Sequence, residues 1–228
     1  VRNVSEWKLF SKIGEAGVSW EEPGYGWTPK FCREVDMTKE RPKFLGRATP
    51  GALPLVEGRM VQAHRFGVKG HVSGTGRRAL WEAYAIGDSR LAPQFWIRLS
   101  DMPSANQHRA DVLRVGFCDI AGQTNERSLM ASLIPAGVVC GNKVPTILFP
   151  EDPSEVRLLV WVSIANSFAF DWMLRRVLTT TVNYFLLQSV PMPKLAKDGL
   201  PWKRLVSAAR ELRTLDSAGA TRETYERM

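Results

Sequence analysis

The stretch Pro54-Leu-Val-Glu-Gly-Arg-Met-Val-Gln62 is an apolar, strand-like run in which an acid and an arginine stand together, and Asp119-Ile-Ala-Gly-Gln-Thr-Asn-Glu-Arg127 resembles it further along. Short runs of this kind, bounded by turn-forming residues, are typical of β-strands. Similar runs between Leu53 and Phe149 are Leu55-Val56, Met60-Val61, Phe95-Trp96-Ile97, Val112 to Ile120, and Gly137 to Cys140. Their spacing predicts a curled, mainly antiparallel sheet.

After Pro153 the apolar residues recur at helical spacing. The pattern from Val156 to Val177 predicts one long helix that is nearly apolar all round and therefore buried on several sides. A final amphipathic helix is expected to start near Pro201. The run Leu129 to Ile134 is too short to distinguish strand from helix, and the end from Asp216 to Met228 is either a solvated helix or frayed.

The chain divides into three parts by these patterns. Residues 1–50 offer one helix at Ser5 to Gly14 and then scattered aromatics, including Trp20 and Trp27, which we expect to wrap over a neighbouring sheet. Residues 51–150 form the β-rich core, and residues 151–228 form a helical support region. The fold class is therefore predicted to be α+β.

Composition favours a folded protein with a polyanionic partner. The 228 residues are 44% hydrophobic and carry a formal net charge of +8, which favours a polyanion as partner, with nucleic acid ranked ahead of an anionic membrane surface. The longest uncharged stretch, Leu158 to Phe170, is shorter than the roughly 20 residues of a membrane-spanning helix, so we expect no membrane span. Of the two polyanions we predict nucleic acid as the partner and not a membrane. The start lacks a signal sequence and is not Met, which predicts a cytoplasmic protein that has been trimmed.

The cysteines give no sign of a metal site. Cys32, Cys118 and Cys140 are an odd number, without a Cys-x-x-Cys pair or a histidine at ligand spacing. We therefore expect no bound metal and inert buried thiols.

The segment from Gly67 to Arg78 is rich in glycine and ends in two arginines. It does not match the phosphate-binding P-loop, which requires Gly-Lys-Ser/Thr before a helix. Glycine lets a backbone approach phosphate closely, and arginine can bridge guanine O6 and N7; the alternative is a solvated, mobile turn. The candidate DNA-binding residues in and around this segment are Arg59, Gln62, His64, Arg65, Lys69, His71, Ser73, Thr75, Arg77 and Arg78. Lys143, in a separate polar turn after Gly141, is a further candidate for a phosphate contact.

Catalytic residues are not expected in this chain. Glu57 has no second acid at matched spacing, so we interpret it as a structural partner of an arginine. No nucleophile motif accompanies His64 or His71. On a regular strand Arg59 and Arg65 would share a face.

Two further pairs of charges are expected to be structural. Glu126 and Arg127 are expected to pair and fix their loop. Asp171 precedes Arg175 by four positions, and an acid before a base at this spacing is the favourable order on a helix.

Several segments follow one another in a characteristic order: Leu55-Val-Glu-Gly-Arg-Met-Val-Gln62, Lys69-Gly-His-Val-Ser-Gly-Thr-Gly-Arg77, Pro93-Gln-Phe-Trp-Ile97, Arg114-Val-Gly-Phe-Cys-Asp-Ile120, Thr124-Asn-Glu-Arg-Ser128, Asn166-Ser-Phe-Ala-Phe-Asp171 and Asn183-Tyr-Phe-Leu-Leu-Gln-Ser-Val-Pro-Met-Pro193. This succession resembles the carboxyl-terminal part of large adenine-N6 DNA methyltransferases. Such enzymes occur as fused type II restriction–modification proteins and in phage-defence systems such as BREX and DISARM. The likeness runs from about Asp36 to Leu215.

The resemblance implies a target-recognition region that grips double-stranded DNA while a catalytic domain methylates a flipped adenine. In that family the catalytic domain supplies the S-adenosylmethionine pocket and an Asn-Pro-Pro-Tyr loop, and this sequence contains neither. Asn183-Tyr184-Phe185 lacks the two prolines. We therefore expect no cofactor and no enzyme activity in this chain alone, and a methyltransferase domain of the same or a partner chain as its second partner.

Two other functions fit parts of the sequence. A metal-dependent nuclease fragment would need spaced acids with a nearby lysine, but Asp36, Lys39 and Glu40 are crowded, and the acids from Glu151 to Glu155 lack a lysine partner. A structural module that docks onto a partner would have an incidental basic surface.

Overall fold

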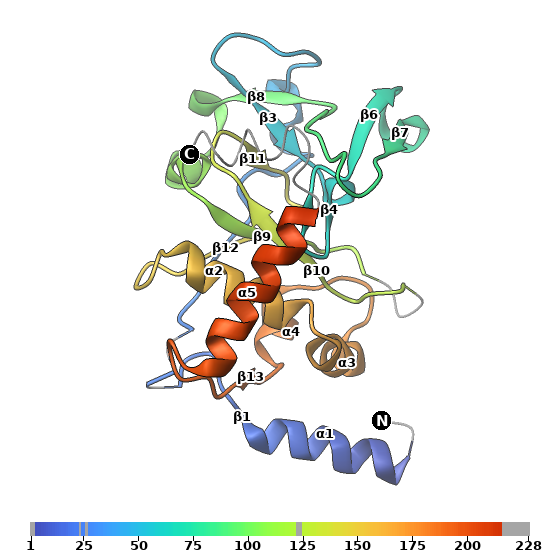
Figure 1. Cartoon of the computed structure of the whole chain (residues 1–228). Helices are drawn as coiled ribbons and strands as arrows, with labels where there is room; N and C mark the ends of the chain where they lie inside the picture. Colours follow the sequence, from blue (N-terminus) through green and yellow to red (C-terminus); the bar gives the residue numbers. More distant parts are fainter. Residues whose placement is uncertain (1–2, 23, 26, 122–124, 216–228) are drawn as a thin grey trace.

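The computed structural model describes residues 3–22, 24–25, 27–121 and 125–215. It contains both helices and mainly antiparallel sheets, which confirms the α+β class. The strands of the β-rich core gather in one half of the molecule, and the helices between residues 155 and 215 lie in the other half (Figure 1). The N-terminal helix lies at the edge of the molecule farthest from the small strand pairs of the first half. Thr124 and the charged end from Asp216 fall outside the described residues.

The largest sheet has four antiparallel strands in the order β10-β9-β12-β2. The run that was ambiguous in the sequence is a strand, β10 (Met130–Ile134), and it pairs with β9 (Arg114–Cys118). The other two strands are β12 (Thr146–Leu148) and β2 (Lys30–Cys32). The N-terminal segment thus adds an edge strand to the core sheet, as well as wrapping it.

The remaining strands form several small sheets, where the sequence pattern had suggested one. Strand β3 (Ala52–Val56) lies between β8 (Trp96–Arg98), to which it is antiparallel, and β11 (Val139–Cys140), to which it is parallel. In the part of the chain that the structure describes, the other strand pairs are β4 (Val61–Gln62) with β5 (Arg65–Phe66), β6 (Lys69–Ser73) with β7 (Leu80–Ala83), and β1 (Gly17–Val18) with β13 (Met192–Pro193).

Short 3-10 turns explain this fragmentation. The turn at Gly58–Met60 interrupts the Pro54–Gln62 run and sends its two ends into different sheets. The other turns are Arg41–Lys43, Gly76–Arg78, Leu99–Asp101 and Ser104–Asp111.

The α-helices among the described residues are α1 (Val4–Ala16), α2 (Glu155–Ala165), α3 (Phe168–Val177), α4 (Tyr184–Gln188) and α5 (Leu200–Leu215). The prediction of a single helix from Val156 to Val177 is wrong. The Ser167 hydroxyl caps a new helix by accepting from the Phe170 N–H at 3.2 Å, and the Asn166 amide leaves the helix to bond both the N–H and the C=O of Ala131. Because Asn and Ser both favour helix ends, the two residues together divide the run.

The main hydrophobic core lies between the four-stranded sheet and the helices, and α2 is buried along most of its length. Trp20 and Trp27 are both in this core; Trp27 stacks on Trp202 of α5 at 5.9 Å and meets Phe149 edge-on at 5.8 Å. Two smaller clusters fill the strand-rich half. The expected wrapping aromatics therefore seal the junction between sheet and helices.

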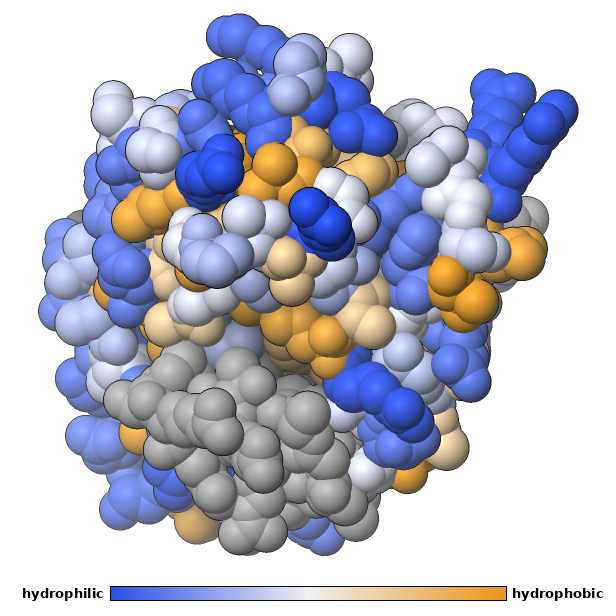
Figure 2. Space-filling model, turned by 90° about the horizontal axis from the view of Figure 1, so that it is seen from above, coloured by the Kyte–Doolittle hydropathy of each residue, from blue (hydrophilic) through white to orange (hydrophobic). Residues whose placement is uncertain are grey.

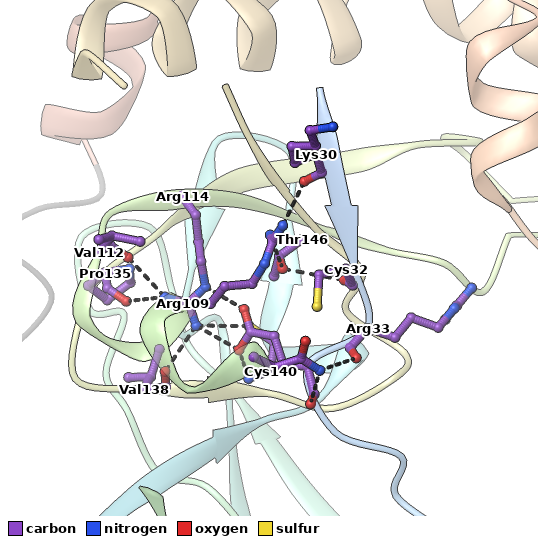
Figure 3. Close-up of polar contacts among 12 residues, drawn as sticks. Lys30, Cys32, Arg33, Arg109, Val112, Arg114, Pro135, Val138, Cys140 and Thr146 are labelled. Carbon is purple, nitrogen blue, oxygen red and sulfur yellow. Dashed lines mark hydrogen bonds and ion pairs between the residues drawn. The ribbon is translucent and has the colours of Figure 1, made fainter. Parts of the chain in front are cut away.

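A buried ion pair joins several elements at the centre of the strand-rich half. Arg114 on β9 donates to both carboxylate oxygens of Glu34, at 2.5 and 2.9 Å, and both side chains are fully buried. The guanidinium also donates to the carbonyl oxygens of Val112, Pro135 and Val138 (Figure 3). Because its donors are used, the charge is held in the interior and ties the segments before β9 and after β10 to the segment that follows β2.

A second buried arginine lies beside the first in Figure 3. Arg109 donates to the Thr146 hydroxyl at 3.2 Å and to the Lys30 carbonyl at 2.9 Å. It thereby attaches the turn Ser104–Asp111 to the β2–β12 edge of the sheet. Among the described residues, no helix combines the length and apolarity needed to cross a bilayer.

Candidate nucleic-acid interface

The glycine-rich segment forms a two-stranded hairpin, β6–β7, that projects from the strand-rich half of the molecule (Figure 1). Its tip is the short turn Gly76–Arg78, and the pairing shifts register between His71 and Ser73. Gly74 has a φ of +75°, and a Cβ atom there would lie 2.5 Å from the Arg78 carbonyl oxygen. Glycine is therefore required at this position, and the tip has a defined shape.

The hairpin tip presents cations and hydroxyls to solvent. Ser73, Thr75, Arg77 and Arg78 are all exposed, and neither arginine forms an ion pair with another described residue. Seen from above, a hydrophilic projection stands out on the side where the hairpin lies (Figure 2). Two unpaired guanidinium groups on a narrow ribbon can approach phosphates or the edges of bases.

An aromatic and basic cluster supports the base of the hairpin. The Arg59 guanidinium lies 4.7 Å from the centre of the Trp81 ring, and the His71 ring meets Trp81 edge-on at 5.5 Å. His71 Nε2 forms a 2.8 Å hydrogen bond with the Gly74 carbonyl oxygen, which also accepts from Gln94 Nε2 at 2.9 Å. The cluster therefore determines the angle at which the tip leaves the body.

Two buried polar atoms in this region have no hydrogen-bond partner among the described residues: Glu57 Oε1 and Trp81 Nε1. Burial raises the pKa of Glu57, and the charges of Arg59 and His71 oppose that rise. The expected arginine partner is thus an electrostatic neighbour and does not hydrogen-bond to Glu57. An acceptor and a donor of this kind can each accommodate one hydrogen bond from an incoming group.

Two of the candidate DNA-binding residues, Arg65 and His64, make contacts within the protein and are not fully exposed to solvent. Arg65 donates to the Ala85 carbonyl at 3.0 Å and to the Ser89 hydroxyl at 3.3 Å, and so holds the loop that follows β7. His64 forms the β4–β5 turn with a φ of +63°, and burial lowers its pKa to about 4. Both side chains are half-buried.

The regular strand on which Arg59 and Arg65 would share a face is not formed. Arg59 lies in the 3-10 turn Gly58–Met60, whereas Arg65 follows a hairpin turn and begins β5. The chain between them is not one regular strand, so alternation does not apply. Gln62 is paired with Arg65 across that hairpin, and Lys69 is half-buried at the start of β6.

Lys143 belongs to a separate group of charges. Its ammonium lies 3.8 Å from Oδ1 of Asp119, a carboxylate that is 1% exposed. Arg33 donates to Asp119 Oδ2 at 2.7 Å and also to the Asn142 carbonyl oxygen. One carboxylate thus faces two partly exposed cations, which leaves a net positive charge at the surface.

The loop before β10 is fixed by α3. The expected Glu126–Arg127 ion pair is not among the contacts of the described residues; Arg127 instead lies over the ring of Phe168 at 4.1 Å. The Asp171–Arg175 pair is confirmed at 3.2 Å. Asp171 also accepts from the Ser128 N–H, and Arg175 donates to the carbonyls of Asn125 and Glu126.

No family model matches this chain, and no curated protein is significantly similar to it. Within the described ranges, no group of three or more His, Cys, Asp or Glu side chains is placed to hold a metal ion.

Sequence reasoning missed Trp81 and Arg33. Trp81 follows the glycine-rich segment by only three positions, and the Leu80-Trp81 pair after Arg77-Arg78 could have marked the returning strand. Arg33 gave no such signal, because its partner Asp119 is 86 positions away. Arg77 and Arg78, two of the candidate DNA-binding residues, are exposed at the hairpin tip.

Proposed function

We propose that this chain recognises double-stranded DNA through the β6–β7 hairpin. The observation that carries the proposal is the pair of unpaired, exposed arginines on a shaped two-stranded ribbon that projects from a protein of net charge +8. The major groove of DNA is about 12 Å wide and admits a two-stranded β-ribbon. The hairpin would enter the groove while cations on the body contact phosphates.

The roles of the residues follow from their contacts. Arg77 and Arg78 would meet base edges or phosphates, with Ser73 and Thr75 as supplementary hydrogen-bonding groups. Arg59, His71 and Trp81 would hold the hairpin at its working angle, and Lys143 with Arg33 would supply a second phosphate contact. Arg65 and His64 would act from the interior, by fixing the loops on either side.

The biological setting we propose comes from the order of motifs along the chain. It is target recognition for an adenine-N6 DNA methyltransferase in restriction–modification or phage defence, in the cytoplasm. Methyl transfer would belong to a catalytic domain that binds S-adenosylmethionine, in the same or a partner chain. The chain described here would contribute duplex binding and no catalytic residue.

Fluorescence anisotropy with a pool of random duplexes at several salt concentrations tests the proposal, followed by sequencing of the bound fraction. The logarithm of affinity should fall with the logarithm of salt by about 0.9 for each phosphate contact. The double variant Arg77→Ala/Arg78→Ala should bind at least about tenfold more weakly and lose the enriched motif. The matched control Lys203→Ala/Arg210→Ala removes the same charge from exposed positions of α5.

Three outcomes are informative. If the hairpin and α5 variants weaken binding equally, net charge alone drives binding and the hairpin is not the reader. A steep salt dependence without an enriched motif would mean that base reading needs the catalytic domain. Absence of binding near physiological salt would refute an independent DNA-binding function.

Asp36 and Glu40, two of the acids considered for a metal-dependent nuclease, form hydrogen bonds within their own turn. Asp36 Oδ1 accepts from the Thr38 and Lys39 N–H groups, and Glu40 Oε2 accepts from the Asp36 N–H at 2.7 Å. The N–H groups of Lys39 and Thr38 lower the pKa of the Asp36 carboxyl, and the three bonds together organise a tight turn. A cleavage assay with Mg²⁺ and supercoiled DNA distinguishes the two functions, since a DNA reader leaves the plasmid intact.

A further inference from the structure

A large apolar groove lies at the opposite end of the molecule from the hairpin. It has a volume of about 850 Å³ and is lined by α1, by α3, by the segment around β13 and by the start of α5. Ile13 forms one wall, Phe170 and Met173 form another, and Val190 and Met192 are among the residues between them. A cavity of this size is at the upper end of the range for binding pockets.

Helix α1 stands at the edge of the body and forms one wall of the groove (Figure 1). None of its residues is buried, and Trp7 is 59% exposed. The contacts that attach it to the body include the β1–β13 pairing next to it, the Phe10–Trp172 ring contact at 6.4 Å, an ion pair between Glu6 and Arg176, and packing of Phe10 and Ile13 against the main core. Apolar surface that is covered so little is more typical of an interaction site than of the free surface of a monomer.

The charges around the groove are of one sign. Lys12 on α1, Lys194 after β13 and Arg204 on α5 all line it, and none of the described residues in its lining is Asp or Glu. Long basic side chains can lay their methylene stems along apolar surface while their charged ends stay in water. An occupant with an apolar centre and carboxylates at its edges would match this pattern.

We infer that the groove binds an amphipathic helical segment of a partner protein, with apolar side chains buried between α1, α3 and α5 and acidic side chains facing Lys12, Lys194 and Arg204. Helices that dock in grooves use anchors at positions i, i+3, i+4 and i+7. The groove is concave and walled on several sides, which suits a rod-shaped segment better than a flat bilayer. This inference does not depend on DNA binding by the hairpin.

A synthetic peptide of about four helical turns tests the inference. It carries leucine at the anchor positions and glutamate elsewhere, and a second peptide replaces every glutamate with lysine. Fluorescence anisotropy with the full chain should show the glutamate peptide binding at least about tenfold more tightly, with a preference that declines as salt rises. Equal binding of both peptides, or of neither, would overturn the inference.

Variants locate the binding site. Ala169→Glu places a carboxylate in the groove at an exposed position and should abolish binding of the glutamate peptide, whereas Ala208→Glu on the exposed side of α5 should not. Lys12→Glu should weaken binding of the glutamate peptide and strengthen binding of the lysine peptide. All three variants should bind duplex DNA nearly as the unmodified chain does, so failure here is distinguishable from failure of the hairpin proposal.

Two other occupants would overturn the inference. Co-sedimentation with vesicles of phosphatidylserine and phosphatidylcholine in equal parts, abolished by Ala169→Glu, would identify a membrane surface. Concentration-dependent dimerisation in sedimentation velocity, abolished by the same substitution, would identify a second copy of this chain. Neither is expected.

Discussion

At the scale of single residues, the protein places charge in its interior where hydrogen bonds compensate for the loss of water. Arg114 and Glu34 are fully buried and are bonded to each other and to surrounding backbone groups. Removing one member of such a pair costs more than the pair contributes, because the other charge remains buried without a partner.

Replacement of Arg114 tests that statement. Arg114→Met introduces an unbranched apolar side chain and leaves the buried Glu34 carboxylate without its cation. The free energy of unfolding should therefore fall by about 3–5 kcal/mol. Urea unfolding followed by circular dichroism measures the change. The double variant Glu34→Met/Arg114→Met should recover part of the loss, and Arg90→Ala, which breaks the exposed pair with Asp88, should have almost no effect. Equal effects for Arg114 and Arg90 would contradict the assignment.

His64 predicts a pH dependence of stability. Its pKa is lowered from 6.5 to about 4 in the folded state, mainly because burial disfavours the charged form. Above pH 6.5 the ring is neutral in both states and has no effect. As the pH falls from 6.5 to 4 the unfolded chain binds the proton first, so the folded state loses up to about 3 kcal/mol.

The variant His64→Asn isolates this contribution, because asparagine tolerates a φ of +63°. Unfolding free energies of both proteins, measured from pH 7 to pH 4, should differ in slope, with the variant losing less stability. Parallel curves would show that His64 is protonated freely in the folded protein.

At the scale of elements, the hairpin and the helices show how small local signals override periodicity. The apolar period continues through Asn166 and Ser167, yet both side chains satisfy backbone groups better at a helix end than in its interior. In the β6–β7 hairpin the glycines determine the shape of the tip. The position of the two arginines therefore depends on a residue without a side chain.

Gly74→Ala should distort the hairpin tip while leaving the body intact. The new Cβ meets the Arg78 carbonyl at 2.5 Å, and the φ of +75° disfavours any other residue. Backbone amides of residues 73–79 should exchange hydrogen faster, and duplex affinity should drop about as much as in the double arginine variant. Gly76→Ala is the matched control: it also has a positive φ of +57° but meets nothing within 4 Å, so its effect should be smaller.

At the scale of the whole molecule, the N-terminal segment belongs to the main core. Trp27 is 1% exposed between Phe149 and Trp202. Its contacts with Phe149 and Trp202 link the N-terminal segment to the end of the core sheet and to α5, which lie far away in the sequence.

Trp27→Ala should therefore lower the free energy of unfolding by about 3–5 kcal/mol and do so for the whole protein at once. Tryptophan fluorescence and far-ultraviolet circular dichroism should report the same midpoint in denaturant. Trp7→Ala, at an exposed position of α1, should leave the midpoint nearly unchanged. Two separate transitions in the Trp27 variant would show that residues before the core sheet unfold independently.

The sequence by itself determined the class of the fold, the change from strands to helices near Pro153, the basic character, and the position of Arg77 and Arg78 at the end of a glycine-rich segment. Each of these depends on composition, on local periodicity, or on glycine and charge within a few neighbouring positions. The Asp171–Arg175 pair was predictable for the same reason, since four residues make about one helical turn.

Only the tertiary structure decided which distant residues meet. The Arg114–Glu34 pair spans 80 positions, and the Asp119–Arg33 pair spans 86. The division of the strands among several sheets, the internal roles of Arg65 and His64, and the basic apolar groove likewise depend on how the elements pack. Local patterns carry no information about such contacts, because the free energy that selects them comes from burying side chains that are far apart along the chain.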